Sequence, residues 1–434
     1  MTIHASGPER AAGGVTIEGA VSAMGTGPLT EAGLREHVWP LFSRVLGRGE
    51  VYLANHSLGR PLDRMAADVG RALDMWYEDM DGVWTDRGGA GGWMEGIEAF
   101  RRLVAGLIGC DRWDAVVPKL TAGSALRAVL NALGDGGRVP RVVTTAHEFD
   151  STDFILRTYR SKGRAEVAFC KPGGEMRGVP WYRADDVIGR IERGVDLVCV
   201  CHTVFSTGQV MPGLGEISAA ARDAGALLLV DSYHSMAAQP MRSFGAGSID
   251  ADFVTGGCYK YARGGTGACF LAVNPRHLSD DGNPALTTLD TGWFAKKDTF
   301  SYARGERVEL SGGGDAWLES TPSVLPMFQA LSGLEFASAV GVDRLRAYNL
   351  EQQAALREAM RGRGLSPVEP EDPGSMGPFA LLASEDAPGL SAALREAGVN
   401  TDARGGFVRF GPDVLNTGEE FGRAAETVAR VVGG

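Results

Sequence analysis

Short apolar runs alternate with stretches of helical periodicity between residues 113 and about 275, and this alternation constrains the fold more than any other feature of the chain. The helical stretches include Ser124–Leu133 and Ile217–Ala224. Short runs rich in Val, Leu and Phe are typical of strands buried on both faces. The predicted strands span residues 115–118, 141–145, 165–169, 196–201, 226–230, 252–255 and 268–273. The pattern predicts an α/β fold, with a mainly parallel sheet covered by helices.

Composition and periodicity divide the chain into four segments. Residues 1–28 are small and polar, and we expect a mobile N-terminal tail. Residues 29–60 are expected to pack against the smaller of two domains. Residues 61–323 would form the large domain that contains the sheet. Residues 324–434 would form a smaller C-terminal α/β domain, which begins with a long helical stretch over 324–362.

The bulk composition excludes several classes of protein. The chain has 434 residues and a net charge of −11, so it lacks the basic surface that nucleic acids require. No apolar run approaches the roughly 18 residues of a membrane span, and residues 1–27 show no signal-peptide pattern. The six cysteines are scattered without a CxxC pair, which suits free thiols in a reducing compartment. We therefore expect a cytoplasmic protein with no nucleic-acid or membrane partner.

Four residues that follow predicted strands are candidates for chemistry, because open α/β sheets bind ligands beyond the carboxyl ends of their strands. Thr121 opens a helix after the first strand, and Phe149 lies just past the second. Asp231 directly follows an apolar strand, and Lys260 follows a short glycine-containing turn. Taken singly, each has an ordinary explanation: a helix cap, a core aromatic ring, a capping carboxylate and a solvated amine.

Together these four residues meet the requirements of pyridoxal 5'-phosphate (PLP). A lysine amine forms the Schiff base, and a carboxylate keeps the pyridine nitrogen protonated so that the ring accepts electrons. A helix N-terminus with a hydroxyl suits the phosphate, and an aromatic ring can stack on the pyridine. The sequence has no G-x-G-x-x-G after its first strand, no Walker motif and no zinc-ligand spacing. We predict PLP on Lys260, and no metal.

Two motifs give the chain a family resemblance. Val230–Ser235 contains Asp-x-x-His, and Lys260 follows Asp231 by 29 residues inside Tyr-Lys-Tyr-x-x-Gly-Gly at Tyr259–Gly265. These elements resemble kynureninase and, more broadly, the class V aminotransferase group of fold-type I PLP enzymes. The resemblance extends from about Tyr52 to the C-terminus.

The resemblance implies roles around the cofactor. Lys260 would hold PLP and move the substrate proton, Asp231 would pair with the pyridine nitrogen, His234 would lie close to the cofactor, and Tyr259 would bind the phosphate and relay a proton. The other matched cofactor positions are Leu120, Thr121, Phe149, Trp293 and Thr321. Trp293 and Thr321 match positions that reach the phosphate of the neighbouring subunit, which implies a homodimer with shared active sites.

The resemblance also implies a substrate site. Arg409 matches an arginine that clamps the substrate carboxylate, a task that suits a bidentate guanidinium. Ser57 and Trp84 match substrate-facing positions. Two alternatives to the role of Arg409 stay open: the arginine could pair with Asp402 or Asp413, or Arg404 could bind the substrate instead from a more exposed turn.

The chain departs from the kynureninase pattern at three places. Ala295 and Lys296 follow Trp293-Phe294 where Gly-His is usual, and no tyrosine follows Arg409 in the Pro-Leu-Tyr position. The acidic position three residues after Phe149 is Thr152, with Asp150 and Asp153 on either side of it. All the residues matched to the cofactor are retained. The three departures therefore bear on which substrate the protein binds.

The residues favour a PLP enzyme that acts on a small α-amino acid. The resemblance implies hydrolytic Cβ–Cγ cleavage of a γ-keto amino acid to alanine and a carboxylic acid. The alternatives are an aminotransferase, a racemase or a β-eliminating C–S lyase of the class V group. A cysteine desulfurase is disfavoured because no cysteine follows Cys269. A non-catalytic protein of this fold would not need Lys260, Asp231 and Arg409 together.

Overall fold

A seven-stranded sheet forms the centre of the larger part of the molecule, in a computed structural model that describes residues 14–84, 92–282, 284–301 and 304–433. In spatial order its strands are β2 (Val116–Lys119), β10 (Cys269–Val273), β9 (Phe253–Gly257), β8 (Leu227–Asp231), β7 (Leu197–Cys201), β3 (Arg141–Thr145) and β4 (Glu166–Cys170). Only β10 runs antiparallel to its two neighbours within this sheet. The predicted mainly parallel sheet is confirmed, with strand bounds within two residues of those expected.

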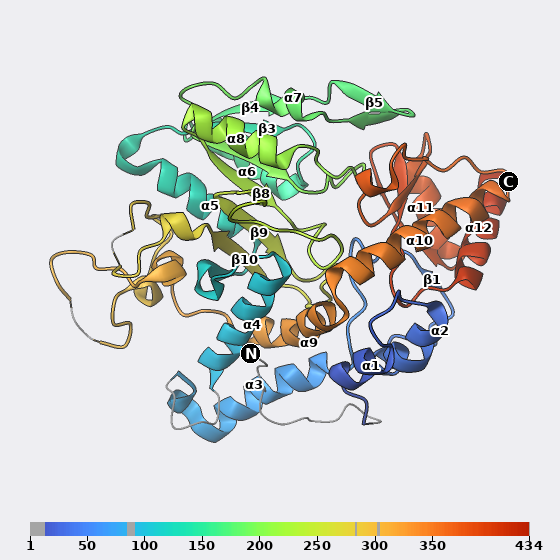
Figure 1. Cartoon of the computed structure of the whole chain (residues 1–434), viewed down its shortest axis with the longest axis horizontal. Coiled ribbons are helices and arrows are strands. Elements are labelled where there is room, and N and C mark those ends of the chain that lie inside the picture. The colour runs from blue at the N-terminus through green and yellow to red at the C-terminus, as the bar shows by residue number, and fades with distance from the viewer. Residues whose placement is uncertain (1–13, 85–91, 283, 302–303, 434) are drawn as a thin grey trace.

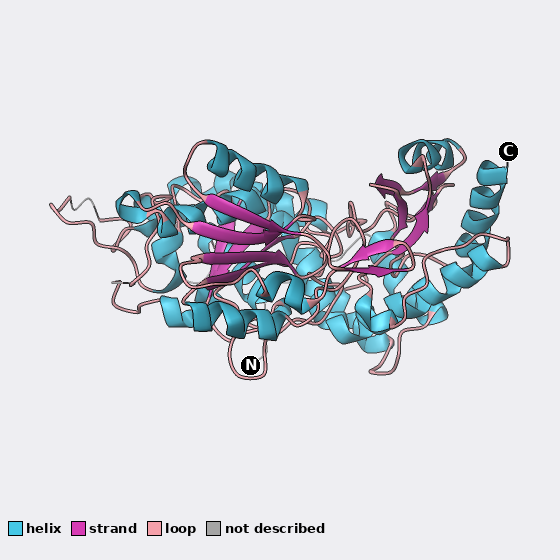
Figure 2. Ribbon diagram, turned by 90° about the horizontal axis from the view of Figure 1, so that it is seen from above, coloured by secondary structure: helices cyan, strands magenta, loops and turns pink. Residues whose placement is uncertain are grey.

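Helices cover both faces of this sheet, as Figure 2 shows from above. Alternate residues of each strand enter different cores, because successive side chains of a strand point to opposite faces. On β7, Val198 and Val200 belong to one core, whereas Leu197 and Cys199 belong to the other. The covering helices are α4 (Trp93–Leu107), α5 (Ala122–Leu133), α6 (Asp150–Ser161), α7 (Ala184–Ile188) and α8 (Leu214–Ala224), and α3 (Met65–Asp79) belongs to the same unit. A hairpin of β5 (Gly174–Met176) and β6 (Val179–Trp181) extends from this unit.

A smaller α/β unit contains the C-terminal part of the chain, coloured orange to red in Figure 1. Its antiparallel sheet has the order β11-β14-β13, and β1 pairs separately with β12. The strands are β1 (Val51–Tyr52), β11 (Ala380–Ala383), β12 (Val399–Asn400), β13 (Asp402–Arg404) and β14 (Phe407–Phe410). The helices are α10 (Val342–Arg361), α11 (Ala387–Glu396) and α12 (Gly418–Gly433). Val51 and Leu53 lie in the core of this unit, whereas Leu34 and Phe42 lie in that of the large one. Residues 29–60 therefore bridge the two units.

The long helical stretch predicted over 324–362 is two helices. Gly341 separates α9 (Val324–Val340) from α10 with a φ of 89°, and the two axes are bent by 84°. Glycine accepts this positive φ without steric cost. Phe328 and Leu334 of α9 lie in the large core, against α3 and α4. This differs from the expected boundary at residue 324, which placed α9 in the smaller domain.

The N-terminal region also differs from the expected mobile tail over 1–28. Residues 1–13 lie outside the described part, but α1 (Ile17–Ala23) is a capped helix whose Ile17 and Ala20 are buried in the large core. Thr16 caps it by accepting a hydrogen bond from the Gly19 N–H at 3.0 Å. α2 (Glu31–Gly33) is a further short turn of helix. Two buried side chains, Ile17 and Ala20, anchor α1 to the large core. The small and polar composition of residues 1–28 gave no indication of this helix.

The helices can be compared with the length and apolar character that a membrane span requires. Within the described ranges, no single helix is long and apolar enough to cross a membrane. The helices α9 and α10 pass such a test only when they are taken together as a bent pair.

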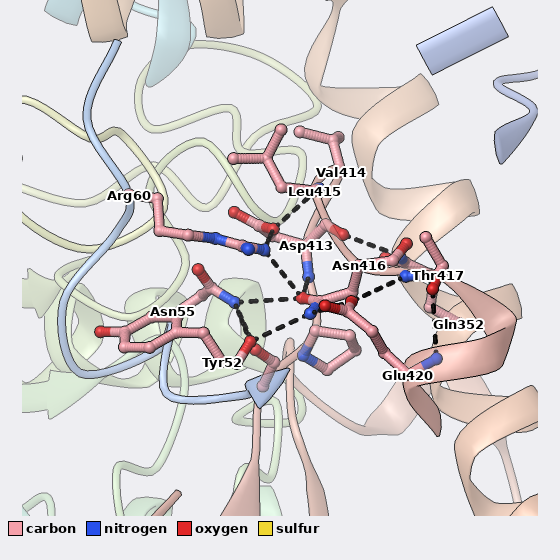
Figure 3. A network of polar contacts seen from close by, with 12 residues as sticks. Tyr52, Asn55, Arg60, Gln352, Asp413, Val414, Leu415, Asn416, Thr417 and Glu420 are labelled. Carbon is pink, nitrogen blue, oxygen red and sulfur yellow. Dashed lines mark hydrogen bonds and ion pairs between the residues drawn. The ribbon is translucent and has the colours of Figure 1, made fainter. Parts of the chain in front are cut away.

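A buried polar network joins residues 52–60 to the turn that follows β14, around Asp413 and Asn416 (Figure 3). Asp413 pairs with Arg60 and, at 3.0 Å, with Arg263, three residues after Lys260. Asn416 accepts from Arg60 at 3.0 Å. Burial alone would raise the pKa of Asp413, but the charges of Arg60 and Arg263 hold it below its usual value. Asp413 is therefore a structural partner of these two arginines and not of Arg409.

Candidate active site

The candidate residues gather at one edge of the central sheet, beyond the carboxyl ends of its parallel strands. Backbone register brings these ends together: Lys119 pairs with Cys269, Cys269 with Gly257, Asp231 with Thr255 and Cys201 with Asp231. Chain segments far apart in sequence therefore leave the sheet side by side. This is the location at which open α/β sheets bind ligands.

Lys260 is the centre of this cluster, and it is 5% exposed. Its Nζ lies 2.5 Å from Nε2 of His234. Three aromatic rings surround the amine, with centroids 5.5 Å away for Phe149, 5.3 Å for Tyr233 and 5.8 Å for Tyr259. The structure thus brings together four residues that the sequence assigned to the cofactor: Lys260, His234, Phe149 and Tyr259.

The charge state of Lys260 suits a nucleophile. Burial and then the positive charge of Arg409 lower the pKa of Lys260 to about 7, against the opposing effect of Asp231 and Asp402. A large share of the amine is therefore uncharged near neutral pH, the form that attacks an aldehyde. Burial, together with Lys260 and Arg409, also lowers the pKa of His234 well below its ordinary value, so His234 is a neutral acceptor for the Nζ proton.

Asp231 ends β8 and is 6% exposed. Its Oδ1 accepts a hydrogen bond from the Tyr233 N–H at 2.8 Å. Burial raises the pKa of Asp231, and Tyr233 and Lys260 oppose this shift only in part. A buried carboxylate is costly without a cationic hydrogen-bond partner. A protonated pyridine nitrogen would supply that partner, so the site fits PLP.

The first turn of α5 closes another side of the cluster. Thr121 is the N-cap, and its hydroxyl accepts from the Ser124 N–H at 3.0 Å. Ala122 contacts the Cys269 sulfur through its N–H, and Cys269 lies 3.5 Å from the Tyr233 hydroxyl. Leu120 and Thr121 are exposed. The positive end of a twelve-residue helix therefore lies near the ring of Tyr233, where a phosphate would be stabilised.

Two glycines permit the close packing around the lysine. A Cβ on Gly59 would lie 1.9 Å from the carbonyl oxygen of Lys260, and a Cβ on Gly257 would lie 2.3 Å from the ring of Tyr233. The Gly59 N–H donates to the carbonyl of Tyr259 at 2.8 Å. Residues 29–60 thereby hold the lysine loop directly.

Arg409 is 2% exposed, on β14, and its guanidinium is already engaged. Nε donates to Oδ1 of Asp402 at 2.7 Å, Nη2 donates to Oδ2 at 2.5 Å, and Nη1 donates to the carbonyl of Phe205. Asp402 also accepts from Nε2 of His56 at 2.7 Å and from the hydroxyl of Ser57. The pairing of Arg409 with Asp402, an alternative that the sequence left open, is present in the structure.

The electrostatics connect this arginine cluster to Lys260. Burial would raise the pKa of Asp402, but His56 and Arg409 hold it far below its ordinary value. Arg404 lies on β13, half-buried, and donates to the carbonyl of Ala403 at 2.7 Å. It is thus in a strand and not in the exposed turn that we expected. Its charge contributes to lowering the pKa of Lys260, after burial and Arg409. Both arginines therefore act on the lysine.

The remaining predicted positions form an aromatic cluster. Trp293 Nε1 donates to the hydroxyl of Thr321 at 3.1 Å, and Trp293 is 41% exposed. The ring of Trp293 lies 4.5 Å from that of Phe294. Trp84 ends the short 3-10 helix η3 (Met80–Trp84), with ring centroids 5.0 Å from Trp93 and 5.8 Å from Phe294. The structure groups Trp84 with Trp293 and Phe294, and its role toward a substrate stays a prediction.

No role was predicted from the sequence for two residues that the structure brings into the site, His56 and Glu148. His56 binds Asp402, which the sequence offered only as a possible partner of Arg409, and Ser57 next to His56 was selected. Glu148 is buried directly before Phe149. The acids considered after Phe149 lie elsewhere: Asp150 is exposed, and Asp153 pairs with Arg157 at 2.7 Å. Glu148 could have been selected from the sequence, because it directly precedes Phe149, a residue already assigned to the cofactor.

Comparisons with known proteins agree with this architecture. The family model described as "Aminotransferase class-V" matches residues 67–365. The chain is 28% identical over 392 residues to the kynureninase of Deinococcus radiodurans, covering 88% of this chain and 90% of the relative. It is 23% identical to the kynureninase of Geobacillus thermodenitrificans, with 85% of each chain covered, and 24% identical to that of Bacillus cereus, with 88% and 89% covered.

Solved structures of similar fold have low sequence identity to this chain. A cysteine desulfurase from Thermococcus onnurineus superposes with a TM-score of 0.70 at 18% identity, covering 88% of this chain and 95% of its own. A cystine C–S lyase superposes with a TM-score of 0.73 at 15% identity, covering 89% and 99%. A lysine-to-alanine variant of the same lyase, with glycine covalently linked to its PLP cofactor, gives a TM-score of 0.74 at 15% identity, covering 90% and 98%. At these identities the likeness shows the fold.

Proposed function

The chain belongs to the class V aminotransferase family and uses PLP as its cofactor, and on this premise we propose that it is a kynureninase-like hydrolase. Its reaction would be cleavage of the Cβ–Cγ bond of a γ-keto α-amino acid, with release of alanine and a carboxylic acid. The kynureninase relatives, which cover most of both chains, support this choice. The observation that carries the proposal is the buried amine of Lys260, with Asp231, His234 and Arg409 around it.

Besides Lys260, four residues of this chain would hold the cofactor. Asp231 would accept from the pyridine nitrogen, Phe149 would stack on the ring, and Thr121 with the first turn of α5 would receive the phosphate. Tyr259, whose pKa is raised by burial, would donate its hydroxyl proton to a phosphate oxygen. When bound, PLP supplies an aldehyde that captures an amino group and a ring that accepts an electron pair from Cα.

Lys260 would move the proton of the reaction. As a free amine, Nζ would take the proton from the substrate Cα and return it later. His234 stays neutral in this environment, so its Nε2 accepts a hydrogen bond from Nζ and orients the lysine lone pair. Burial excludes competing water from the amine.

Arg409 would bind the substrate carboxylate. A guanidinium carries five N–H donors, and the bonds to Asp402 and Phe205 use one N–H on each of Nε, Nη1 and Nη2. One N–H on each terminal nitrogen is left for a ligand. Ser57 would act through Asp402, to which its hydroxyl donates, and Trp84 stays a proposed substrate contact.

The alternatives within the family are transamination, racemisation and β-elimination from a cystine-like substrate, the activity named for one of the fold neighbours. A desulfurase reaction needs a reactive cysteine thiolate. All six cysteines of this chain are buried, and burial raises the pKa of each thiol. This argues against a persulfide-forming mechanism.

The deciding experiment offers the holoenzyme kynurenine, 3-hydroxykynurenine and cystine in separate reactions. Alanine release from either kynurenine, absent with the Lys260→Ala variant, is expected. Pyruvate from cystine with no alanine from the kynurenines would replace the hydrolase with a C–S lyase. Conversion of the cofactor to its amino form, with release of a keto acid, would indicate an aminotransferase.

We also propose that the protein works in the cytoplasm as a two-fold homodimer that shares its active sites. Buried, unpaired cysteines suit a reducing compartment. Trp293 and Thr321, exposed and hydrogen-bonded to each other, would reach the partner's phosphate. Sedimentation analysis of the holoenzyme tests this assembly, and a monomer with full cofactor occupancy would rule it out.

A further inference from the structure

Glu148 is a buried carboxyl group to which the functions above assign no task. It lies in the turn between β3 and α6, directly before Phe149, and is 3% exposed. Its Oε1 accepts from the hydroxyl of Thr145 at 2.6 Å and from the Cys201 N–H at 3.2 Å. Its Oε2 is buried and has no hydrogen-bond partner among the residues that the structure describes.

The bond to Cys201 places Glu148 beside the acid of the cofactor site. Cys201 ends β7, and in the backbone register it pairs with Asp231, which ends β8. Glu148 is therefore held at the strand next to the one that carries Asp231. Two carboxyl groups in such a buried position cannot both ionise at low cost, because like charges in a poorly solvated site repel strongly.

The surroundings leave the proton on Glu148. The titratable groups around it are Asp231, Cys199, Cys201, Tyr182 and His147. Burial raises the pKa of the thiols and of the Tyr182 phenol and lowers that of His147, so these four groups are uncharged near neutral pH. Asp231 supplies the remaining charge, and it is negative. Burial, followed by the charge of Asp231, raises the pKa of Glu148 to about 8 despite the bond from Thr145.

The position of the proton follows from the hydrogen bonds. Oε1 already accepts two donors, so the acidic hydrogen belongs on Oε2, the oxygen with no partner.

We propose that Glu148 is a second carboxyl group of the cofactor site, a positioning residue that stays protonated so that Asp231 is the ionised acid facing the pyridine nitrogen. A neutral Glu148 adds no second negative charge at the strand next to Asp231, so Asp231 keeps its own charge for the ring nitrogen. The inference depends on the cofactor alone and holds whichever reaction the enzyme catalyses. It also gives this chain an acid beside Phe149 where position 152 is a threonine.

The test follows the visible absorbance of the bound cofactor from about pH 6 to about pH 10, which brackets the pKa of about 8. The wild-type holoenzyme should show an ionisation step near pH 8 that Glu148→Gln removes, because the amide keeps the neutral donor and cannot ionise. Glu148→Gln should hold PLP within about threefold of wild type, whereas Glu148→Ala should weaken binding about tenfold. Asp150→Asn is the matched control, an exposed acid on the other side of Phe149, and should keep the step.

Two results would overturn the proposal. A step near pH 8 that survives in Glu148→Gln would assign it to another group. A loss of PLP affinity beyond about a hundredfold in Glu148→Gln would mean that the site needs an ionised Glu148. If Glu148→Ala does not fold, the comparison of Glu148→Gln with wild type decides alone. Neither readout uses substrate, so failure of the hydrolase proposal leaves this test intact.

Discussion

Arg409 and Asp402 lie opposite each other in the β13–β14 pair, and the guanidinium donates to both carboxylate oxygens, with Nε 2.7 Å from Oδ1. His56 and Ser57 hold the same carboxylate from the N-terminal side. Asp402 orients Arg409, and Asp402 is itself held by His56 and Ser57, which lie 346 and 345 positions earlier in the chain. Three predictions depend on this cluster or on the lysine beside it, and a fourth concerns Asp231.

Asp402→Asn should lower both activity and stability. The amide keeps the size of the side chain but leaves the buried Arg409 without its counter-charge, which costs on the order of 3–5 kcal/mol. We expect a lower Tm and a fall in kcat/KM of at least about tenfold, mainly through KM, because the guanidinium loses its orientation. Steady-state kinetics and thermal unfolding measure these effects. The exposed Asp223→Asn is the control, and an equal loss there would show a non-specific charge effect.

Arg409→Ala should reduce kcat/KM at least about tenfold, since a charge-assisted bond to a carboxylate contributes about 1.5–3 kcal/mol. Arg409→Lys should not restore activity, because an ammonium cannot keep both the Asp402 fork and a substrate carboxylate. Titration of the holoenzyme with an unreactive amino acid reports binding directly. If Arg404→Ala abolishes that binding while Arg409→Ala retains it, the roles of the two arginines must be exchanged.

The apoenzyme should capture PLP faster as pH rises through about 7, the pKa of Lys260. A lysine with a lowered pKa is charged and unreactive below that value and is a free amine above it. Stopped-flow absorbance measures the rate. Arg409→Ala should move the rise to higher pH, because the positive charge that helps to lower the pKa is gone. Lys260→Ala should give no borohydride-stable adduct, and a rise near the ordinary lysine value of about 10.4 would contradict the burial argument.

Asp231→Asn should fold but bind PLP about tenfold to a hundredfold more weakly and lose most activity. The amide cannot balance a protonated ring nitrogen, and a charge-assisted hydrogen bond of about 1.5–3 kcal/mol disappears. Equilibrium dialysis and the visible spectrum measure the effect. Unchanged affinity and turnover would show that another acid, with Glu148 as the first candidate, pairs with the ring.

Local sequence determined the sheet and the residues that follow its strands. The central strands are buried on both faces, so each is a continuous apolar run that can be read without knowing its neighbours. Thr121, Phe149, Asp231 and Lys260 were found because they follow such runs, and parallel strands bring their carboxyl ends to one edge.

Tertiary structure alone decided the burial of turn residues and the partners of charged ones. Glu148 is a polar residue in a turn, and it is buried only because β7 places Cys201 against it. Asp402 belongs to Arg409 and His56, and Asp413 to Arg60 and Arg263, although both acids are close to Arg409 in sequence. Asp402 meets Arg409 across the β13–β14 pair, seven residues away, whereas Asp413 meets Arg60 and Arg263 over 353 and 150 residues of sequence. Apolar periodicity carries no information about such pairs, because charge pairing has no local period.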